Sequence, residues 1–240
     1  MRRVGMIPII SNLLFSFKLR ALLRNLLHSE DTAKRTERIL SLTSANLPPD
    51  ICACEERGLP GDPEFQKNGW WRIMLARYAL ALEYARGKKA LDCCCGLGWG
   101  AYLLSSKAQS VIGLDLDMDS LKFAADALRD EHLHLICGDA LHLPFAEESF
   151  DLVTSMESLE HFSREDGENL LLELRRVLKR CGLLIGSTFF ARSEDEARQN
   201  LGRNPYHLHI WTLQDARITM GKIFRNVLIY PNRLFFKAVK

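Results

Sequence analysis

The sequence lacks an excess of charge of either sign, and it lacks internal repeats and low-complexity tracts. Its 240 residues include 32 Lys and Arg against 30 Asp and Glu, a formal net charge of +2. Such a balance gives no whole-chain argument for nucleic acid or for acidic partners. The length suits one sizeable domain with an extension, and hardly two domains.

Paired C-x-x-C units, the usual mark of a structural zinc site, are missing as well. The seven cysteines include three consecutive ones, Cys93 to Cys95, and a lone C-x-C at Cys52 and Cys54. Adjacent residues do not converge easily on one metal ion, and the C-x-C unit has no second half. The pattern predicts small buried thiols in a reducing compartment, and no metal.

Long apolar runs are also missing. The apolar stretch from Val4 to Phe17 is too short to span a bilayer, Pro8 interrupts it, and no small-residue cleavage site follows. We therefore expect neither a cleaved signal nor a transmembrane helix, and we predict a cytoplasmic protein. Residues 12–28 read as a basic amphipathic helix. We predict that its apolar face packs on the core or covers the substrate pocket as a lid; peripheral contact with a membrane surface is the alternative.

Helical and strand patterns alternate through most of the chain. Predicted helices at 31–43 and 70–86 flank a polar, Pro- and Gly-containing segment, 46–69, that reads as a long loop. After Lys88 the alternation predicts an α/β fold with a doubly wound, mostly parallel seven-stranded sheet. The predicted strands cover 89–94, 109–115, 133–137, 149–156 and 182–189, and the helices between them cover 99–107, 118–131 and 164–179.

The last seventeen residues, FRNVLIYPNRLFFKAVK, break this alternation. They read as two strands joined at Pro231-Asn232, which predicts an antiparallel hairpin at the edge of the sheet. The predicted organisation is therefore an N-terminal helical cap with a loop, residues 1–69, followed by an α/β domain, residues 70–240.

A glycine-rich turn follows the first predicted strand. In ALDCCCGLGWG, residues 90–100, Asp92 precedes Gly96, Gly98 and Gly100, and these glycines open a helix. Glycine permits a tight turn and a close approach of the backbone to a ligand, while the helix N-terminus offers free N–H groups. The stretch alone also satisfies the dinucleotide-binding pattern G-x-G-x-x-G/A, so the segments that follow must decide.

The second and third predicted strands also lead into acids. VIGLD places Asp115 at a strand end, where a carboxylate can bind the ribose diol of NAD or of S-adenosylmethionine. Asp139 begins G-D-A-x-x-L-P-F, and S-F-D-x-V opens the fourth strand at Ser149. With D-x-G-x-G-x-G, these segments resemble the class I S-adenosylmethionine-dependent methyltransferase superfamily, in its small-molecule group, over about residues 70–240. Dinucleotide enzymes have no counterpart of Asp92 or of the Asp139 block.

The resemblance implies a set of cofactor contacts. Asp92, with Gly96 and Gly98, would line the methionine end of S-adenosylmethionine. Asp115 would take both ribose hydroxyls, and Leu116 would lie against the adenine. The remaining implied contacts are Asp139 at the adenine amino group, Ala140 beside it, and Met156 near the sulfonium. For each acid, the alternative is a solvated surface carboxylate.

Two positions depart from the pattern of the superfamily. Cys94 stands where the first glycine is usual, at the place where the backbone approaches the methionine moiety. We expect a reduced affinity but retained binding, because cysteine is small. Arg180-Cys181-Gly182 replaces the usual Pro-Gly-Gly in a predicted loop, at little expected cost.

Candidate catalytic residues follow the fourth predicted strand. Methyl transfer is an in-line displacement that mainly needs alignment, and a base is required only if the acceptor must lose a proton. Glu157, Glu160 and His161 are within reach of the strand end. We select His161, with Glu157 beside it, because an unperturbed histidine titrates near neutrality. Anchoring of the following loop by His161 is an equal alternative.

The segment NPYHLHIWT, residues 204–212, resembles the N-P-[FY]-H-x-x-E-[FY] stretch of bacterial methyltransferases of glycan and cell-envelope biosynthesis. Tyr206 and His207 are the predicted substrate contacts. In an extended segment His207 and His209 face a common side, and for them we favour substrate contact or loop anchoring over metal binding. Neither N-P-P-[YF] nor a Pro-Cys nucleophile is present, which disfavours nucleic-acid acceptors.

The sequence thus predicts an S-adenosylmethionine-dependent methyltransferase that needs no metal. The predicted acceptor is a small molecule, most simply a hydroxyl of a sugar or of a lipid-linked intermediate. The alternatives are a non-catalytic S-adenosylmethionine-binding module and a methyltransferase that acts on a macromolecule.

Overall fold

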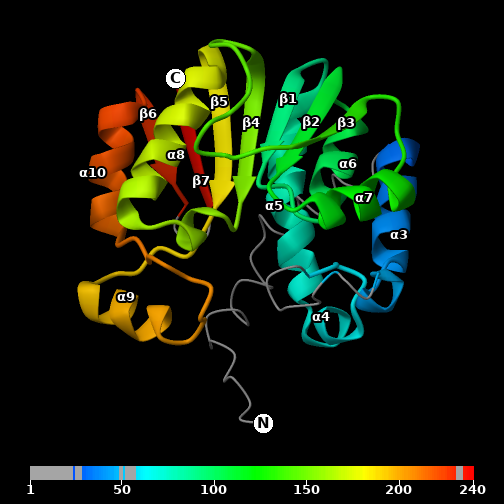
Figure 1. Cartoon of the computed structure of the whole chain (residues 1–240), viewed down its shortest axis with the longest axis horizontal. Coiled ribbons are helices and arrows are strands. Elements are labelled where there is room, and N and C mark those ends of the chain that lie inside the picture. Colours follow the sequence, from blue (N-terminus) through cyan, green and yellow to red (C-terminus); the bar gives the residue numbers. More distant parts are fainter. Residues whose placement is uncertain (1–23, 25–28, 49–50, 52–57, 231–234) are drawn as a thin grey trace. The chain divides into compact units, whose positions relative to one another are not determined.

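A computed structural model describes residues 24, 29–48, 51, 58–230 and 235–240 of the chain (Figure 1). The helix predicted over 12–28 lies outside the described residues, except for Arg24, which is helical and exposed. The chain divides into two compact units, Met1–Leu80 and Ala81–Lys240, and each is described by itself.

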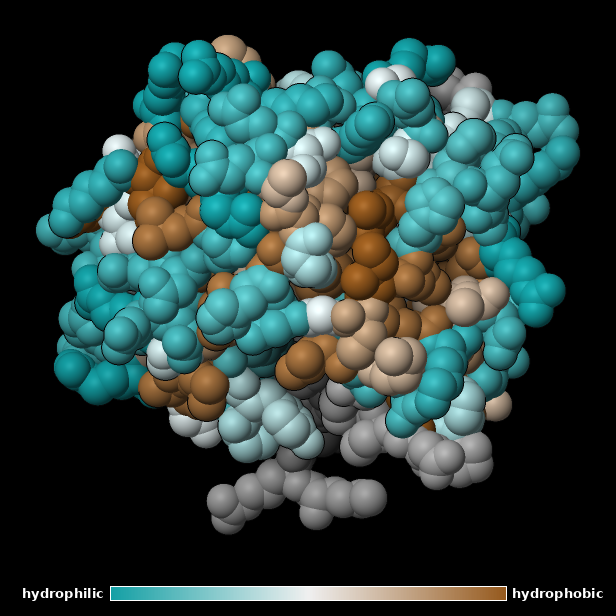
Figure 2. All heavy atoms as spheres, turned by 45° about the horizontal axis from the view of Figure 1, so that its top comes forward, coloured by the Kyte–Doolittle hydropathy of each residue, from teal (hydrophilic) through white to brown (hydrophobic). Residues whose placement is uncertain are grey.

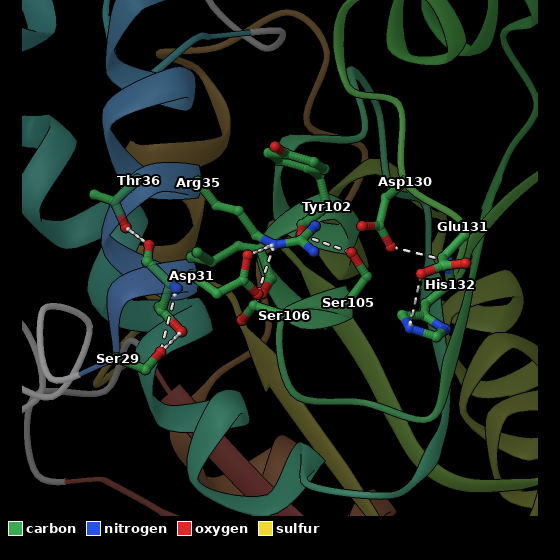
Figure 3. Close-up of polar contacts among 12 residues, drawn as sticks. Ser29, Asp31, Arg35, Thr36, Tyr102, Ser105, Ser106, Asp130, Glu131 and His132 are labelled. Atoms are coloured by element: carbon green, nitrogen blue, oxygen red, sulfur yellow. Dashed lines mark hydrogen bonds and ion pairs between the residues drawn. The ribbon is translucent and has the colours of Figure 1, made fainter.

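The first unit contains a helix that the sequence predicts, α3, at Glu30–Ser41. The Ser29 side chain caps it by accepting the N–H of Thr32 at 3.2 Å. Asp31 and Arg35, one helical turn apart, form an ion pair at 3.1 Å, as Figure 3 shows. The cap and the acidic first turn both stabilise the N-terminal end of the helix.

The long loop predicted over 46–69 is wrong in its last part. The structure has a short 3-10 helix, η1, at Ser44–Asn46 and an α-helix, α4, at Pro63–Asn68. Pro63 is at the start of α4, and Gly69, at φ 77°, ends it. Proline and glycine therefore act here as helix start and stop signals and not as marks of an irregular loop. Helix α5 follows at Trp70–Ala85, close to its predicted range.

The second unit is built on a seven-stranded sheet, which confirms the predicted fold class. The strand order is β3-β2-β1-β4-β5-β7-β6, and only β7 runs antiparallel to its neighbours (Figure 1). The strands are β1 Lys89–Cys93, β2 Ser110–Asp115, β3 Leu133–Cys137, β4 Phe150–Met156, β5 Leu178–Ser187, β6 Asn226–Ile229 and β7 Phe235–Val239. The predicted C-terminal hairpin is therefore present at the sheet edge, and its predicted turn, Pro231-Asn232, lies outside the described residues.

Helices connect the parallel strands, as the alternation of patterns requires. Helices α6 and α7 pack beside β1, β2 and β3, and α8 and α10 pack beside β5 and β6. Their bounds are α6 Trp99–Ser105, α7 Met118–Ala127, α8 Arg164–Val177, α9 Glu194–Leu201 and α10 Leu213–Ile223. The sequence did not predict α9 and α10. Helix α9 buries only Ala197, and α10 contains the β-branched Ile218 and Thr219 as well as Gly221, so neither has a strong helical pattern.

The segment Arg180-Cys181-Gly182 lies inside β5 and not in a loop, so that expectation is wrong. The register between β4 and β5 shifts here, because Phe150 pairs with Leu178 while Leu152 pairs with Leu183. Cys181 has φ 62°, in the left-handed region, and its side chain is exposed. Arg180-Cys181-Gly182 thus forms a β-bulge within β5 instead of a turn before it.

The expectation of buried thiols holds only partly. Cys93 and Cys95 are buried and Cys94 is half-buried, but Cys137 and Cys181 are exposed, and all five are free thiols. Among the described helices, none is both long and apolar enough to cross a membrane.

Figure 2 shows one face of the protein, where hydrophobic residues gather near the centre and hydrophilic residues surround them. In the described part of the chain, the exposed large apolar residues are Tyr84, Leu116, Met118, Leu172, Tyr206, Leu208, Ile218 and Leu228. Four of these, Leu116, Met118, Tyr206 and Leu208, belong to the segments that carry the predicted site.

Candidate functional site

The carboxyl ends of β1 and β4 meet where the strand order reverses. Asp92 of β1 pairs in register with Thr154 of β4, and the Thr154 hydroxyl donates to Asp92 Oδ1 at 2.6 Å. Both side chains are fully buried. In open α/β sheets, ligands bind outside the carboxyl ends at such a switch point. The loops that leave β1 and β4 therefore border the candidate site.

The loop after β1 turns through three residues in the left-handed region. Cys94, Gly96 and Gly98 have φ values of 60°, 52° and 72°. A Cβ built on Gly96 would meet nothing within 4 Å, so this glycine faces open space. A Cβ on Gly98 would lie 2.7 Å from the Cβ of Ala124 in α7. Gly96 thus leaves room for a ligand, and Gly98, at the start of α6, permits close packing of α6 against α7.

Asp115, the last residue of β2, is tied to this loop. Its Oδ2 accepts the N–H of Gly96 at 2.7 Å, and its Oδ1 accepts the N–H of Asp117 at 3.0 Å. Asp117 in turn caps α7 by accepting the N–H groups of Asp119 and Ser120, as the sequence predicts. An ionised carboxylate has about four acceptor positions, so Asp115 keeps capacity for further donors.

The residues implied to hold the adenine lie on the neighbouring strand ends. Leu116, next to Asp115 after the end of β2, is 73% exposed. Asp139 Oδ1 accepts the N–H of Leu141 at 2.9 Å, and its Oδ2 lies 3.0 Å from His142 Nδ1. These two contacts, the one with His142 first, lower the pKa of Asp139. Ala140 beside it is buried.

Cys94 is strained at the position where the superfamily usually has glycine. A non-glycine residue in the left-handed region costs roughly 1–2 kcal/mol, partly offset by the greater chain entropy that glycine loses on folding. We expect Cys94→Gly to raise the free energy of unfolding by about 0.5–1 kcal/mol, measured by urea denaturation. It should also tighten S-adenosylhomocysteine binding, because the side chain no longer narrows the loop.

The control for this prediction is Cys181→Gly. Cys181 has nearly the same φ, 62°, but it lies within β5 and is exposed. This variant should gain a similar stability with an unchanged affinity. A Cys94→Gly variant that loses stability would show that packing of the thiol outweighs the backbone strain.

The segment after β4 and the segment 204–209 come together in the structure, although 45 positions separate His161 from Tyr206. The backbone carbonyl of Glu160 accepts the N–H of Leu208 at 2.8 Å. His161 Nδ1 lies 3.1 Å from the carbonyl oxygen of Tyr206. The rings of His161 and His207 are in edge contact, with centroids 5.3 Å apart. Three of the predicted catalytic and substrate residues, His161, Tyr206 and His207, thus form one cluster in the segments that follow β4 and β5.

Glu160 is the residue of this cluster whose importance the sequence did not reveal. It was one of three candidates, but His161 and Glu157 were selected. The structure buries Glu160, with 3% of its surface exposed. Burial, and next the nearby carboxylate of Glu157, raise the pKa of Glu160 to about 8. A carboxyl group with such a pKa can exchange protons near neutrality, which the sequence argument had reserved for histidine.

His209 does not join this cluster. Its ring packs against Trp211, with centroids 5.2 Å apart, and burial lowers its pKa. Asn204 instead contacts His207, with its Nδ2 at 3.1 Å from His207 Nε2. The two rings therefore have different neighbours, His161 for His207 and Trp211 for His209, and a turn at 205–206 precedes them.

The chain is similar to known methyltransferases. Residues 91–186 match the family described as a methyltransferase domain. The demethylmenaquinone methyltransferase of Lactobacillus johnsonii is 35% identical over 123 residues, which cover 48% of this chain and 48% of that protein. The chain therefore spans about half the length of the curated relatives it matches.

Solved structures show the same fold. The YcgJ protein from Bacillus subtilis aligns with a TM-score of 0.57 at 23% identity, covering 63% of this chain and 69% of that one. The phosphoethanolamine N-methyltransferase 2 of Haemonchus contortus, in complex with S-adenosyl-L-methionine, aligns with a TM-score of 0.56 at 18% identity. That alignment covers 67% of this chain and 51% of the other.

Proposed function

We propose that this chain, in which residues 91–186 match a methyltransferase domain, is a class I S-adenosylmethionine-dependent methyltransferase that transfers a methyl group to a small-molecule acceptor. The cofactor supplies an electrophilic methyl group on a sulfonium. The chain itself has to bind that cofactor, hold the acceptor in line with the methyl group and handle the acceptor proton.

One observation carries the cofactor assignment. Asp115 accepts the N–H of Gly96, and Gly96 faces open space at the switch point of the sheet. This contact ties the carboxylate proposed to bind the ribose to the loop proposed to border the methionine end. Leu116, exposed next to Asp115, supplies an apolar surface suited to a purine. These residues fit the cofactor, and Asp139 with Ala140 is proposed to complete the adenine side.

The acceptor is proposed to lie against the cluster after β4. Tyr206, 53% exposed, and His207 would contact it, and Met156 would lie near the transferred methyl group. We propose that an acceptor hydroxyl loses its proton to this cluster, as the sequence indicates for His161 and Glu157. Glu160, which is buried, is the third member of this proton-accepting group.

Two observations support the proposed chemical class of the acceptor: the apolar residues at the site and the names of the relatives. Tyr206 and Leu208 are both more than half exposed and give the cluster an apolar border, which suits a hydrophobic small molecule or a lipid-linked one. The relatives from Lactobacillus johnsonii and Thermotoga maritima are both named demethylmenaquinone methyltransferases. We propose that the acceptor is a hydroxylated small molecule with a hydrophobic part. A non-catalytic cofactor-binding module is the second candidate, and the strained Cys94 is the observation that favours it.

Calorimetric titration of the full chain with S-adenosylhomocysteine, and separately with NADH, tests the cofactor. Binding of S-adenosylhomocysteine alone is expected, and binding of NADH alone would overturn the proposal. A panel of hydroxyl, amine and thiol acceptors with labelled S-adenosylmethionine then tests the reaction. Transfer only to amines or thiols would refute the hydroxyl acceptor. Tight S-adenosylhomocysteine binding with no transfer to any acceptor would favour the non-catalytic module.

A further inference from the structure

Three side chains near the end of β4 bring potential metal ligands together. One atom each from Glu160, His161 and His207 lies within 4.8 Å of the other two. Ligand atoms around a first-row ion are roughly 3–4 Å apart, because each bond to the ion is about 2.1 Å long. To place all three on one ion, the side chains have to move closer together, and His207 Nε2, which accepts from the Asn204 amide at 3.1 Å, has to exchange that donor for the ion.

The hydrogen bonding of His161 prepares it as a ligand. A backbone carbonyl only accepts, so the contact between His161 Nδ1 and the Tyr206 oxygen requires a proton on Nδ1. The lone pair is then on Nε2. Metal-binding histidines usually have this arrangement, in which the second ring nitrogen donates to a carbonyl or a carboxylate and fixes the ring.

Glu160 offers an independent sign of a missing ligand. Thr188 forms a side-chain hydrogen bond with the carboxyl group, but the buried Oε2 atom itself has no hydrogen-bond partner in the described part of the chain. Glu157 lies near enough to repel it electrostatically. A buried carboxylate oxygen without a donor is costly, and a second carboxylate nearby adds to the cost. A cation held between Glu160 and the two imidazoles would remove both penalties.

We propose that Glu160, His161 and His207 bind one first-row divalent metal ion per chain, of the Zn²⁺ type. Two imidazoles and one carboxylate form a ligand set that such ions prefer and that Mg²⁺ does not. Three protein ligands leave a position open for water or for an acceptor oxygen. This departs from the expectation of no metal, which considered His207 together with His209.

A bound ion would allow the cluster to activate an acceptor hydroxyl. A divalent ion lowers the pKa of an oxygen bound to it, so an acceptor hydroxyl at the open position would release its proton to solvent water more easily. The oxygen would then bond to the methyl carbon of S-adenosylmethionine as the carbon–sulfur bond breaks, with S-adenosylhomocysteine as the leaving group. This consequence rests on the proposed methyltransferase function. Binding of the ion rests only on the three side chains, so the two can be tested separately.

Equilibrium dialysis of the full chain against Zn²⁺, and absorption spectra with Co²⁺, test the site. We expect one ion per chain and Co²⁺ bands of nitrogen and oxygen ligation, without the charge-transfer band of a thiolate. That band matters because the chain has free cysteines. His161→Ala and His207→Ala should each weaken binding by about a hundredfold or more, since even the loss of a partner outside the ligand set costs 10–100-fold.

Two other histidines provide matched controls. His209→Ala changes the same segment, and His132→Ala removes a half-exposed histidine before β3; both should leave metal binding unchanged. Equal metal uptake by wild type and by the His161→Ala and His207→Ala variants would overturn the inference, and so would a thiolate spectrum. Circular dichroism and urea denaturation of every variant show that it is folded, and titration with S-adenosylhomocysteine separately reports cofactor binding. Cofactor binding without metal binding refutes this site alone, and metal binding without cofactor binding refutes the proposed function alone.

Discussion

Asp115→Ala is expected to weaken S-adenosylhomocysteine binding by about a hundredfold, because each hydrogen bond to a charged group contributes roughly 1.5–3 kcal/mol and 1.4 kcal/mol is tenfold in affinity. Asp115 is proposed to accept from both ribose hydroxyls. It also accepts the N–H groups of Gly96 and Asp117, so the variant loses the contact that ties the loop after β1 to the end of β2. Calorimetry gives the affinity, and urea denaturation gives the accompanying loss of stability.

Asp115→Asn and Asp126→Ala complete this experiment. The amide keeps one acceptor oxygen, so Asp115→Asn should fall between the wild type and Asp115→Ala. Asp126 is an exposed acid of α7 that pairs only with Arg129 among the contacts seen, and its removal should leave the affinity unchanged. An unaltered affinity in Asp115→Ala would mean that this carboxylate serves the loop and does not bind the ribose.

The fold could be predicted because its signals are local. Each parallel strand is a short apolar run with a helical pattern after it, and this alternation permits few topologies. The acids Asp92 and Asp115 could be placed at one edge of the sheet for the same reason, since carboxyl ends of parallel strands share an edge. The structure agrees on both, with Asp92 opposite Thr154 and Asp115 at the end of β2.

The acceptor side could be predicted only in outline. His161, Tyr206 and His207 were identified separately, but their contact depends on how the chain returns after β5. The burial of Glu160 depends on the same return, because the segment that covers it supplies the N–H of Leu208. No pattern near position 160 reports that burial. Burial is the larger cause of the raised pKa of Glu160, and it depends on a segment far away in the sequence, so only the structure reveals it; the second cause, Glu157, is three positions away.

Helix α4 was missed for a different reason. Proline and glycine were read as signals of an irregular segment, but their order matters. Pro63 comes first and Gly69 last, which is the arrangement of a helix start and a helix stop. The position of each residue relative to its neighbours therefore carries more information than the composition of the segment.

Substitutions at the two glycines of the loop after β1 are expected to have different effects. Gly98→Ala should mainly lower stability, and Gly96→Ala should mainly weaken ligand binding. In Gly98→Ala the new Cβ would meet Ala124 at 2.7 Å, and the residue would keep a φ of 72°. Overpacking costs about 1–3 kcal/mol and the left-handed backbone about 1–2 kcal/mol, so we expect a loss of roughly 2–5 kcal/mol in the free energy of unfolding. Urea denaturation at a fixed temperature measures it.

Gly96→Ala should behave in the opposite way. Its Cβ would meet no protein atom within 4 Å, so only the backbone penalty remains, about 1 kcal/mol. The same methyl group would project into the space that we propose for the cofactor, and S-adenosylhomocysteine binding should weaken by at least about tenfold, equivalent to 1.4 kcal/mol. Gly221→Ala is the control, since Gly221 has open space around it, an ordinary helical backbone and a place in α10. If Gly96→Ala bound the cofactor as tightly as Gly221→Ala, the open space at Gly96 would not be the binding site, and the proposed position of the cofactor would be wrong.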